Sequence, residues 1–181
     1  DFQLLLRERE ILPALLDLIK RSVVSLHILA FTFDHPEIQA AIVGALQRGV
    51  LVKIILDQNQ MERKGSCVHQ KAVIRNLFEW NSPLLHIFLY QPLHRGRNAV
   101  QHTKAAVGDQ AAAITGSANF TRNSLDTCAE FDICTRCAKI VKSLCCMLSD
   151  LEKKGKPFHQ RDLVPLMRAE ELGCAHDNEV H

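Results

Sequence analysis

The sequence predicts an α/β fold in which helices cover both faces of a mixed, largely parallel β-sheet. Short apolar runs typical of buried strands alternate with longer segments whose apolar residues recur every three or four positions, as in helices. The first strand, helix and strand follow one another closely, with Gly49 between the helix and the second strand. This order indicates a βαβ unit with parallel neighbouring strands.

The elements of the N-terminal third follow from this pattern. Residues 3–20 are predicted to form an amphipathic helix, in which Pro13 marks a break or a later start. Residues 23–31 are expected as a buried strand, 34–48 as a helix and 50–56 as the second strand of the βαβ unit.

The rest of the chain continues the alternation. From residue 57 onward we expect a polar loop (57–65), a helix (66–80), a strand (84–90), a loop (91–98), a strand (101–107), a second strand beginning at 111–114, a turn or short helix (120–126), a strand (130–134) and a closing helix (138–154). Residues 1–155 are thus predicted to form one domain, and 156–181 a polar C-terminal tail with at most one short helix.

Composition limits the class of protein. The chain has 181 residues, 47% of them hydrophobic, with 22 basic and 20 acidic residues. These values exclude a disordered, strongly acidic or histone-like chain. They do not exclude nucleic-acid binding, because the local arrangement of charge matters more than the total. No apolar run is long enough for a transmembrane helix.

The seven cysteines are odd in number and irregularly spaced, which argues against a disulfide framework and mildly favours a reducing compartment. Cys134 and Cys137 have the spacing of half a zinc or redox site, and Cys174 with His176 is the nearest second pair. We favour small buried residues over a metal site. The sequence begins at Asp1 without Met, so a preceding targeting or anchor segment can be missing, and localisation stays open.

One segment carries most of the chemistry: His102-Thr103-Lys104, then Asp109, then Gly116-Ser117-Ala118-Asn119. Residues two apart in a strand share a face, so His102 and Lys104 should point into one site, and Ser117 and Asn119 can do the same. Gly116 lets the backbone turn or approach a ligand closely. An imidazole, an ammonium, a hydroxyl and a carboxamide in one place provide a nucleophile and donors for phosphoryl transfer.

Three acidic residues accompany this segment. Glu130 is expected to accept a hydrogen bond from one ring nitrogen of His102, which would leave the other nitrogen free to attack. Asp132 shares the face of Glu130, and for it we favour a role outside the chemistry. Asp109 lies between two predicted strands, where an aspartate often bonds turn backbone groups, so we expect a structural role.

The pattern H-x-K-x4-D-x6-G-S-x-N resembles the HKD signature of the phospholipase D superfamily. The resemblance implies metal-independent cleavage of phosphodiesters through a phosphohistidine, with no cofactor. A single copy of the motif resembles the branch of bacterial Nuc-type endonucleases and mitochondrial phospholipase D (Zucchini). Members of that branch are homodimers in which two motifs meet at the two-fold axis.

In such a site, one His102 attacks phosphorus, and the partner subunit's His102 protonates the leaving oxygen. Lys104 and Asn119 hold the non-bridging oxygens, assisted by Ser117.

The substrate is the open question. Arg95, Arg97 and Arg122 flank the motif and are candidates for a groove that follows a nucleic-acid backbone, which favours DNA or RNA. The first alternative is a phospholipid such as cardiolipin in a membrane, and a transferase acting on an alcohol is another. An inactive binding module would have no need of all four chemical groups.

A second H-x-K sequence, His69-Gln70-Lys71, lacks the remaining motif residues. It lies in a predicted helix, where residues two apart diverge, so we expect His69 to be a surface or packing residue.

Overall fold

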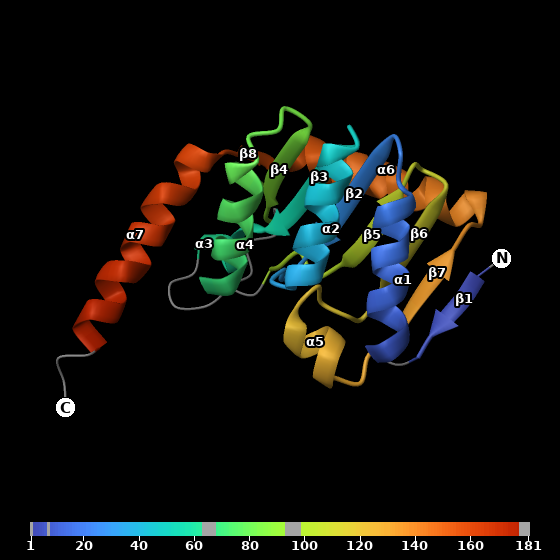
Figure 1. The fold of residues 1–181 in the computed structure, drawn as a ribbon, viewed down its shortest axis with the longest axis horizontal. Coiled ribbons are helices and arrows are strands. Elements are labelled where there is room, and N and C mark those ends of the chain that lie inside the picture. Colours follow the sequence, from blue (N-terminus) through green and yellow to red (C-terminus); the bar gives the residue numbers. More distant parts are fainter. Residues whose placement is uncertain (1, 7, 63–67, 93–98, 178–181) are drawn as a thin grey trace.

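The computed structural model describes residues 2–6, 8–62, 68–92 and 99–177, which form a mixed eight-stranded sheet with helices on both faces (Figure 1). The strands lie in the order β1-β7-β6-β5-β2-β3-β4-β8. The first elements are β1 (Phe2–Leu5), α1 (Glu8–Arg21), β2 (Ser25–Ala30), α2 (Pro36–Gln47), β3 (Leu51–Asp57), α3 (Gln58–Glu62), α4 (Val68–Glu79) and β4 (Leu85–Tyr90). They are followed by β5 (Lys104–Gly108), β6 (Ala112–Gly116), α5 (Arg122–Thr127), β7 (Asp132–Thr135), α6 (Ala138–Lys154), β8 (Lys156–Phe158) and α7 (Gln160–Asp177).

The predicted class, an α/β fold with helices on both faces of a mixed sheet, is confirmed. The expected predominance of parallel strands is wrong. Only the β2–β3 and β3–β4 pairs are parallel, and the other five pairs of neighbouring strands described are antiparallel. For the β5–β6 pair the reason is local: three residues, 109–111, join the two strands, and so short a connection can only reverse the chain.

The beginning of the chain also differs from the prediction. Residues 3–5 belong to strand β1, which pairs with β7 and places Leu5 opposite Asp132, and helix α1 begins only at Glu8. Pro13 lies inside this helix. A short leucine run fits a strand as well as a helix, and here pairing with a distant strand decided the outcome.

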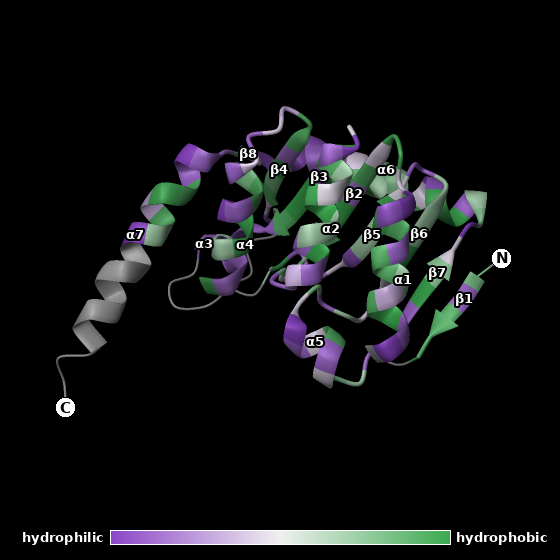
Figure 2. Ribbon diagram, in the orientation of Figure 1, coloured by the Kyte–Doolittle hydropathy of each residue, from purple (hydrophilic) through white to green (hydrophobic). Residues whose placement is uncertain are grey.

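Two hydrophobic cores lie against the two faces of the sheet. On one face, α1, α2 and α4 pack against side chains such as Ile28, Ile54 and Ile114. On the other face, α6 covers a smaller cluster that includes Ala105 and Val107 of β5. Figure 2 shows the strands mostly hydrophobic and the helices carrying both kinds of residue, as expected for helices with one buried side.

The turn between β5 and β6 is tied to β2. Asp109 and Gln110 both have positive φ, 53° and 54°, and Ala111 closes the turn with a 2.9 Å bond to the Gly108 carbonyl. The Asp109 carboxylate accepts from the amides of Val23, Val24 and Ser25 at 2.8–3.2 Å. These bonds lower the pKa of Asp109, although burial acts in the opposite direction. Asp109 therefore holds the β5–β6 hairpin against the start of β2.

The segment expected as a polar tail contains a strand and a helix. Strand β8 pairs antiparallel with β4, and Phe158 and Leu163 are buried in the larger core. Helix α7 runs away from the sheet (Figure 1). No helix among the described residues is long and apolar enough to cross a bilayer. Within the same ranges, no group of three or more His, Cys, Asp or Glu side chains has the arrangement of a metal site.

Candidate active site

His102 and Lys104 meet at the start of β5. The Lys104 ammonium lies 3.1 Å from each ring nitrogen of His102 and donates to the His102 carbonyl at 2.8 Å. Lys104 is the first residue of the strand and is buried, whereas His102 precedes the strand and is exposed. The predicted convergence of the two side chains is present, with the imidazole open to an incoming group.

The surroundings of His102 favour the neutral form of its imidazole. Its pKa is lowered by partial burial and by the positive charge of Lys104, which outweigh the opposing effect of Asp57. Burial also lowers the pKa of Lys104, while the negative charges of Glu130 and Asp132 raise it. A neutral imidazole has a free lone pair on one nitrogen, so these shifts favour His102 as a nucleophile at neutral pH.

Phe31 forms an aromatic wall of the site that the sequence analysis missed. Its ring meets the His102 ring edge-on, with centroids 4.7 Å apart, and Lys104 Nζ lies 5.5 Å from its centroid. The position of Phe31 directly after β2, at the same edge of the sheet, is the only signal that the sequence offers.

Asp57 fixes the segment that leads into His102. Its carboxylate is fully buried at the end of β3 and accepts from the Gln101 amide at 2.7 Å and from the Gln60 amide at 2.9 Å. The Gln101 side chain in turn donates to the Thr103 carbonyl at 3.1 Å. An acidic residue at the end of an apolar run was the available sequence signal for Asp57.

Gly116 makes room for a buried carboxyl group beside Lys104. In the sheet, Gly116 pairs with Lys104 on one side and with Asp132 on the other. A Cβ atom at position 116 would collide with Asp132 Oδ1 and with the Phe131 carbonyl. Asp132 Oδ1 accepts from the Ala118 amide at 3.1 Å, and burial raises the pKa of Asp132 to about 6. The motif glycine is thus required by this packing.

Glu130 holds the loop 117–119 through two serines. Ser117 Oγ donates to Glu130 Oε2 and Ser124 Oγ donates to Oε1, both at 2.5 Å. Ser117 Oγ also accepts from the Phe131 amide at 3.0 Å, and Ser124 Oγ accepts from the Asn119 amide at 2.9 Å. We call Ser117, Glu130 and Ser124 the serine clasp.

The clasp changes what Glu130 and Ser117 can do within one chain. Both Glu130 oxygens accept from serines, and the described residues show no bond from Glu130 to the His102 ring. Ser117 directs its proton to Glu130 and so has none to offer a phosphoryl oxygen in this arrangement. Lys104 and Asn119 remain as donors. The buried Oδ1 of Asn119 has no hydrogen-bond partner among the described residues.

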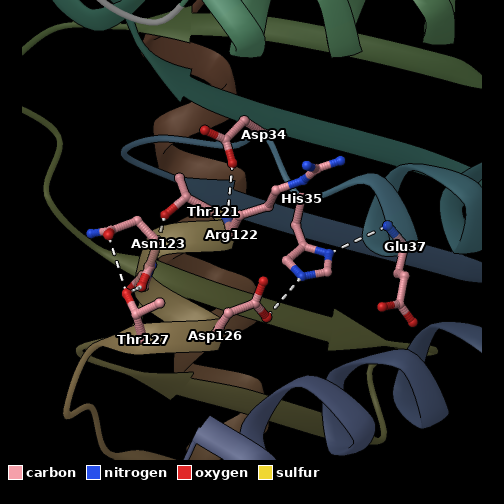
Figure 3. A network of polar contacts seen from close by, with 9 residues as sticks. Asp34, His35, Glu37, Thr121, Arg122, Asn123, Asp126 and Thr127 are labelled. Atoms are coloured by element: carbon pink, nitrogen blue, oxygen red, sulfur yellow. Dashed lines mark hydrogen bonds and ion pairs between the residues drawn. The ribbon is translucent and has the colours of Figure 1, made fainter.

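The three arginines differ in what can be said of them. Arg95 and Arg97 lie outside the described residues. Arg122 is exposed at the start of α5, where its amide donates to Asp34 Oδ1 at 2.9 Å (Figure 3).

In the second H-x-K sequence, His69 is exposed and Lys71 is buried on helix α4, so the expectation that the two side chains diverge is confirmed.

Comparisons with known proteins agree with this fold. A family model described as cardiolipin synthase, PLD-like domain, matches residues 15–151. NucT from Helicobacter pylori superposes with a TM-score of 0.77 at 20% identity, covering 87% of this chain and 99% of that one. Nuc from Salmonella typhimurium, a phospholipase D family member, gives 0.71 at 21% identity, covering 88% and 100%.

Phosphatidylserine synthase from Haemophilus influenzae gives a TM-score of 0.72 at 15% identity, covering 98% of this chain and 45% of that one. At such identities the similarity concerns the fold. No curated protein matches the chain.

Proposed function

The chain belongs to the phospholipase D-like family of phosphodiesterases, and we propose that it is a metal-independent endonuclease that cleaves nucleic-acid phosphodiesters through a phosphohistidine in a homodimeric site. The observation that carries this proposal is the contact of the Lys104 ammonium with the exposed His102 imidazole, 3.1 Å from either ring nitrogen. Such a pair offers a neutral nucleophile beside a cation that can hold a phosphoryl oxygen.

The proposed reaction has two steps. In the first, the free nitrogen of one His102 forms a bond to phosphorus while the bond from phosphorus to the leaving oxygen breaks, and the partner subunit's protonated His102 gives its proton to that oxygen. In the second, the imidazole of the partner subunit's His102, now neutral, removes a proton from water, and the water oxygen displaces the phosphohistidine nitrogen from phosphorus. Lys104 and Asn119 stabilise the equatorial oxygens in both steps.

Two findings support nucleic acid as the substrate. This chain matches NucT and Nuc, the type of the endonuclease branch that the motif resembles, over 99% and 100% of their own length. Arg122 follows the catalytic loop and is exposed, so its guanidinium is available to a phosphate. The second candidate is a phospholipid phosphodiester such as that of cardiolipin, favoured by the description of the family model and by the similarity to phosphatidylserine synthase.

The proposal is tested by incubating labelled single-stranded and duplex DNA and RNA with the protein in excess EDTA. We expect cleavage that survives EDTA and is lost in His102→Ala. His159→Ala, at an exposed histidine directly after β8, is the matched control and should cleave normally. The mass of the protein in solution, measured by sedimentation, tests the homodimer.

Cleavage by His102→Ala at the wild-type rate would show that His102 is not the nucleophile. If neither protein cleaves nucleic acid, the same pair is tested on vesicles that contain cardiolipin, and hydrolysis there establishes the second candidate.

A further inference from the structure

A hollow of about 470 Å³ lies between helices α2, α4 and α5, and the proposed reaction makes no use of it. It is lined by three apolar residues and by six polar side chains: Asp34, Gln39, His69, Asn76, Arg122 and Asn123. Its volume lies within the range typical of pockets for small organic groups. His69 of the incomplete H-x-K sequence is among its residues, so this histidine need not be only a surface residue.

The hollow and the catalytic groups are bounded by the same two segments. Phe31 touches the His102 ring, and three residues later Asp34 lines the hollow. Asn119 belongs to the catalytic loop, and three residues later Arg122 lines the hollow. Three residues of chain span at most roughly 10 Å. A strand of nucleic acid bound at His102 would therefore place a neighbouring nucleotide within reach of the hollow.

The walls of the hollow are fixed by hydrogen bonds (Figure 3). The amides of Asp34 and His35 donate to the Phe120 carbonyl at 3.0 and 3.1 Å, and Asp34 Oδ1 accepts from the Arg122 amide at 2.9 Å. The buried His35 imidazole bridges the Glu37 amide, at 3.3 Å, and Asp126, at 3.4 Å. Because α2 and α5 are already tied together, little conformational entropy would be lost when the hollow binds a ligand.

The chemistry of the hollow fits an uncharged, hydrogen-bonding group better than an isolated anion. The Asp34 carboxylate offsets the positive charge of the Arg122 guanidinium, and this carboxylate would repel an anion. Gln39, Asn76 and His69 offer both donors and acceptors, and within the described part of the chain their side chains form no hydrogen bond. Pro36, Ala72 and Val73 add apolar contact. A nucleobase has this combination of a flat apolar face and a polar edge.

We propose that the hollow between α2, α4 and α5 binds the base of a nucleotide that flanks the scissile phosphate, so that the protein senses a base as well as a backbone. This inference rests on the proposed nuclease function. Pro36, Ala72 and Val73 would contact the face of the base, and Asn76 and His69 would bond its edge.

The test uses a single-stranded oligonucleotide with one normal phosphodiester among uncharged methylphosphonate linkages, so that the site of cleavage is fixed. An abasic residue is then moved along the strand, and kcat/KM is measured at each position. For the wild-type protein we expect one position near the cut where loss of the base lowers kcat/KM about tenfold, in line with the ~1–3 kcal/mol that a stacked base contributes.

Two variants assign this effect to the hollow. Asn76→Ala, on helix α4, should cleave the intact oligonucleotide about tenfold less well and should no longer distinguish it from the abasic one. Arg75→Ala removes a cation from the exposed side of the same helix, where it pairs with Glu79 at 3.7 Å, and should behave as wild type. Alanine is a good helix former, so neither change threatens α4. Both variants should hydrolyse bis(4-nitrophenyl) phosphate, which has no base, at the wild-type rate.

Cleavage that is equally fast at every abasic position overturns the inference and leaves the nuclease proposal intact. An abasic effect that persists unchanged in Asn76→Ala does the same. If the wild-type protein hydrolyses bis(4-nitrophenyl) phosphate but no oligonucleotide, the proposed substrate fails, and the inference fails with it.

Discussion

Replacing Ser124 by alanine should slow catalysis without touching any group that meets the substrate. The Ser124 hydroxyl accepts from the Asn119 amide and donates to Glu130, and it is buried. Without it, the Asn119 amide loses its partner and Glu130 keeps only Ser117. The loop 117–119 is then held by the clasp at one end only, so the Asn119 carboxamide should leave the position in which we propose that it binds the phosphoryl group.

The size of the effect follows from these two bonds. An unsatisfied buried amide costs about 1–3 kcal/mol, and a bond to a charged partner contributes roughly 1.5–3 kcal/mol. Because the site is partly open to water, we expect a loss of about 2 kcal/mol in the free energy of unfolding. Misplacing a catalytic group by about 1 Å can cost a factor of ~10². We therefore expect kcat to fall about 10- to 100-fold, with KM changed much less.

The assay measures kcat, KM and the free energy of unfolding for Ser124→Ala, Glu130→Ala and the double variant. If Ser124 acts through Glu130, adding Ser124→Ala to Glu130→Ala should reduce kcat little further. Thr121→Ala is the matched control. It removes the N-cap of the same helix, whose hydroxyl accepts from the Ser124 amide at 3.2 Å, and should cost about 1 kcal/mol of stability.

A Ser124→Ala protein with normal kcat and reduced stability would refute the reasoning. So would a Thr121→Ala variant whose kcat falls as far as that of Ser124→Ala, because the effect would then belong to the whole helix.

Three further predictions concern stability. Gln110→Gly should raise the free energy of unfolding by about 1 kcal/mol in urea denaturation, since a left-handed backbone costs a residue with a side chain ~1–2 kcal/mol; a loss of stability would contradict this. Gly116→Ala should lower stability by more than ~3 kcal/mol because its Cβ atom meets Asp132 and the Phe131 carbonyl, and an unchanged melting temperature would speak against that contact. Asp132 titrates at about 6 in the folded protein, above its ordinary value of 3.8, so its ionisation destabilises the fold as pH rises through that interval. Between pH 4.5 and pH 7.5, the free energy of unfolding of Asp132→Asn should therefore rise relative to that of wild type, by at most about 3 kcal/mol. A difference between the two proteins that is the same at both pH values would refute the raised pKa of Asp132.

The sequence predicted the parts of the fold that depend on local pattern. The strand–helix–strand unit from β2 to β3 was expected because its strands are mostly apolar and its helix has a clear buried side. Strand β1 was not, because Leu4 and Leu5 fit either type of element and the partner strand begins at Asp132, far along the chain. Pairings of this kind are invisible to short-range periodicity.

The candidate site shows the same division. His102 and Lys104 were expected together, although His102 lies before the strand and the long Lys104 side chain folds back over it. The contributions of Phe31 and Asp57 depend on how distant segments meet at one edge of the sheet. Ser124 lies on the helix that follows the loop 117–119, and nothing in its local sequence distinguishes it from a solvated serine.

The two outermost strands have a consequence for any attempt to isolate the part of the chain that resembles its relatives. Strands β1 and β8 lie at opposite ends of the strand order, and both fall outside residues 15–151. A fragment trimmed to those residues would leave β7 and β4 with unpaired amides and carbonyls along one side. Bare strand edges are templates for pairing with other chains, so such a fragment would be prone to aggregation even with His102 and Lys104 intact.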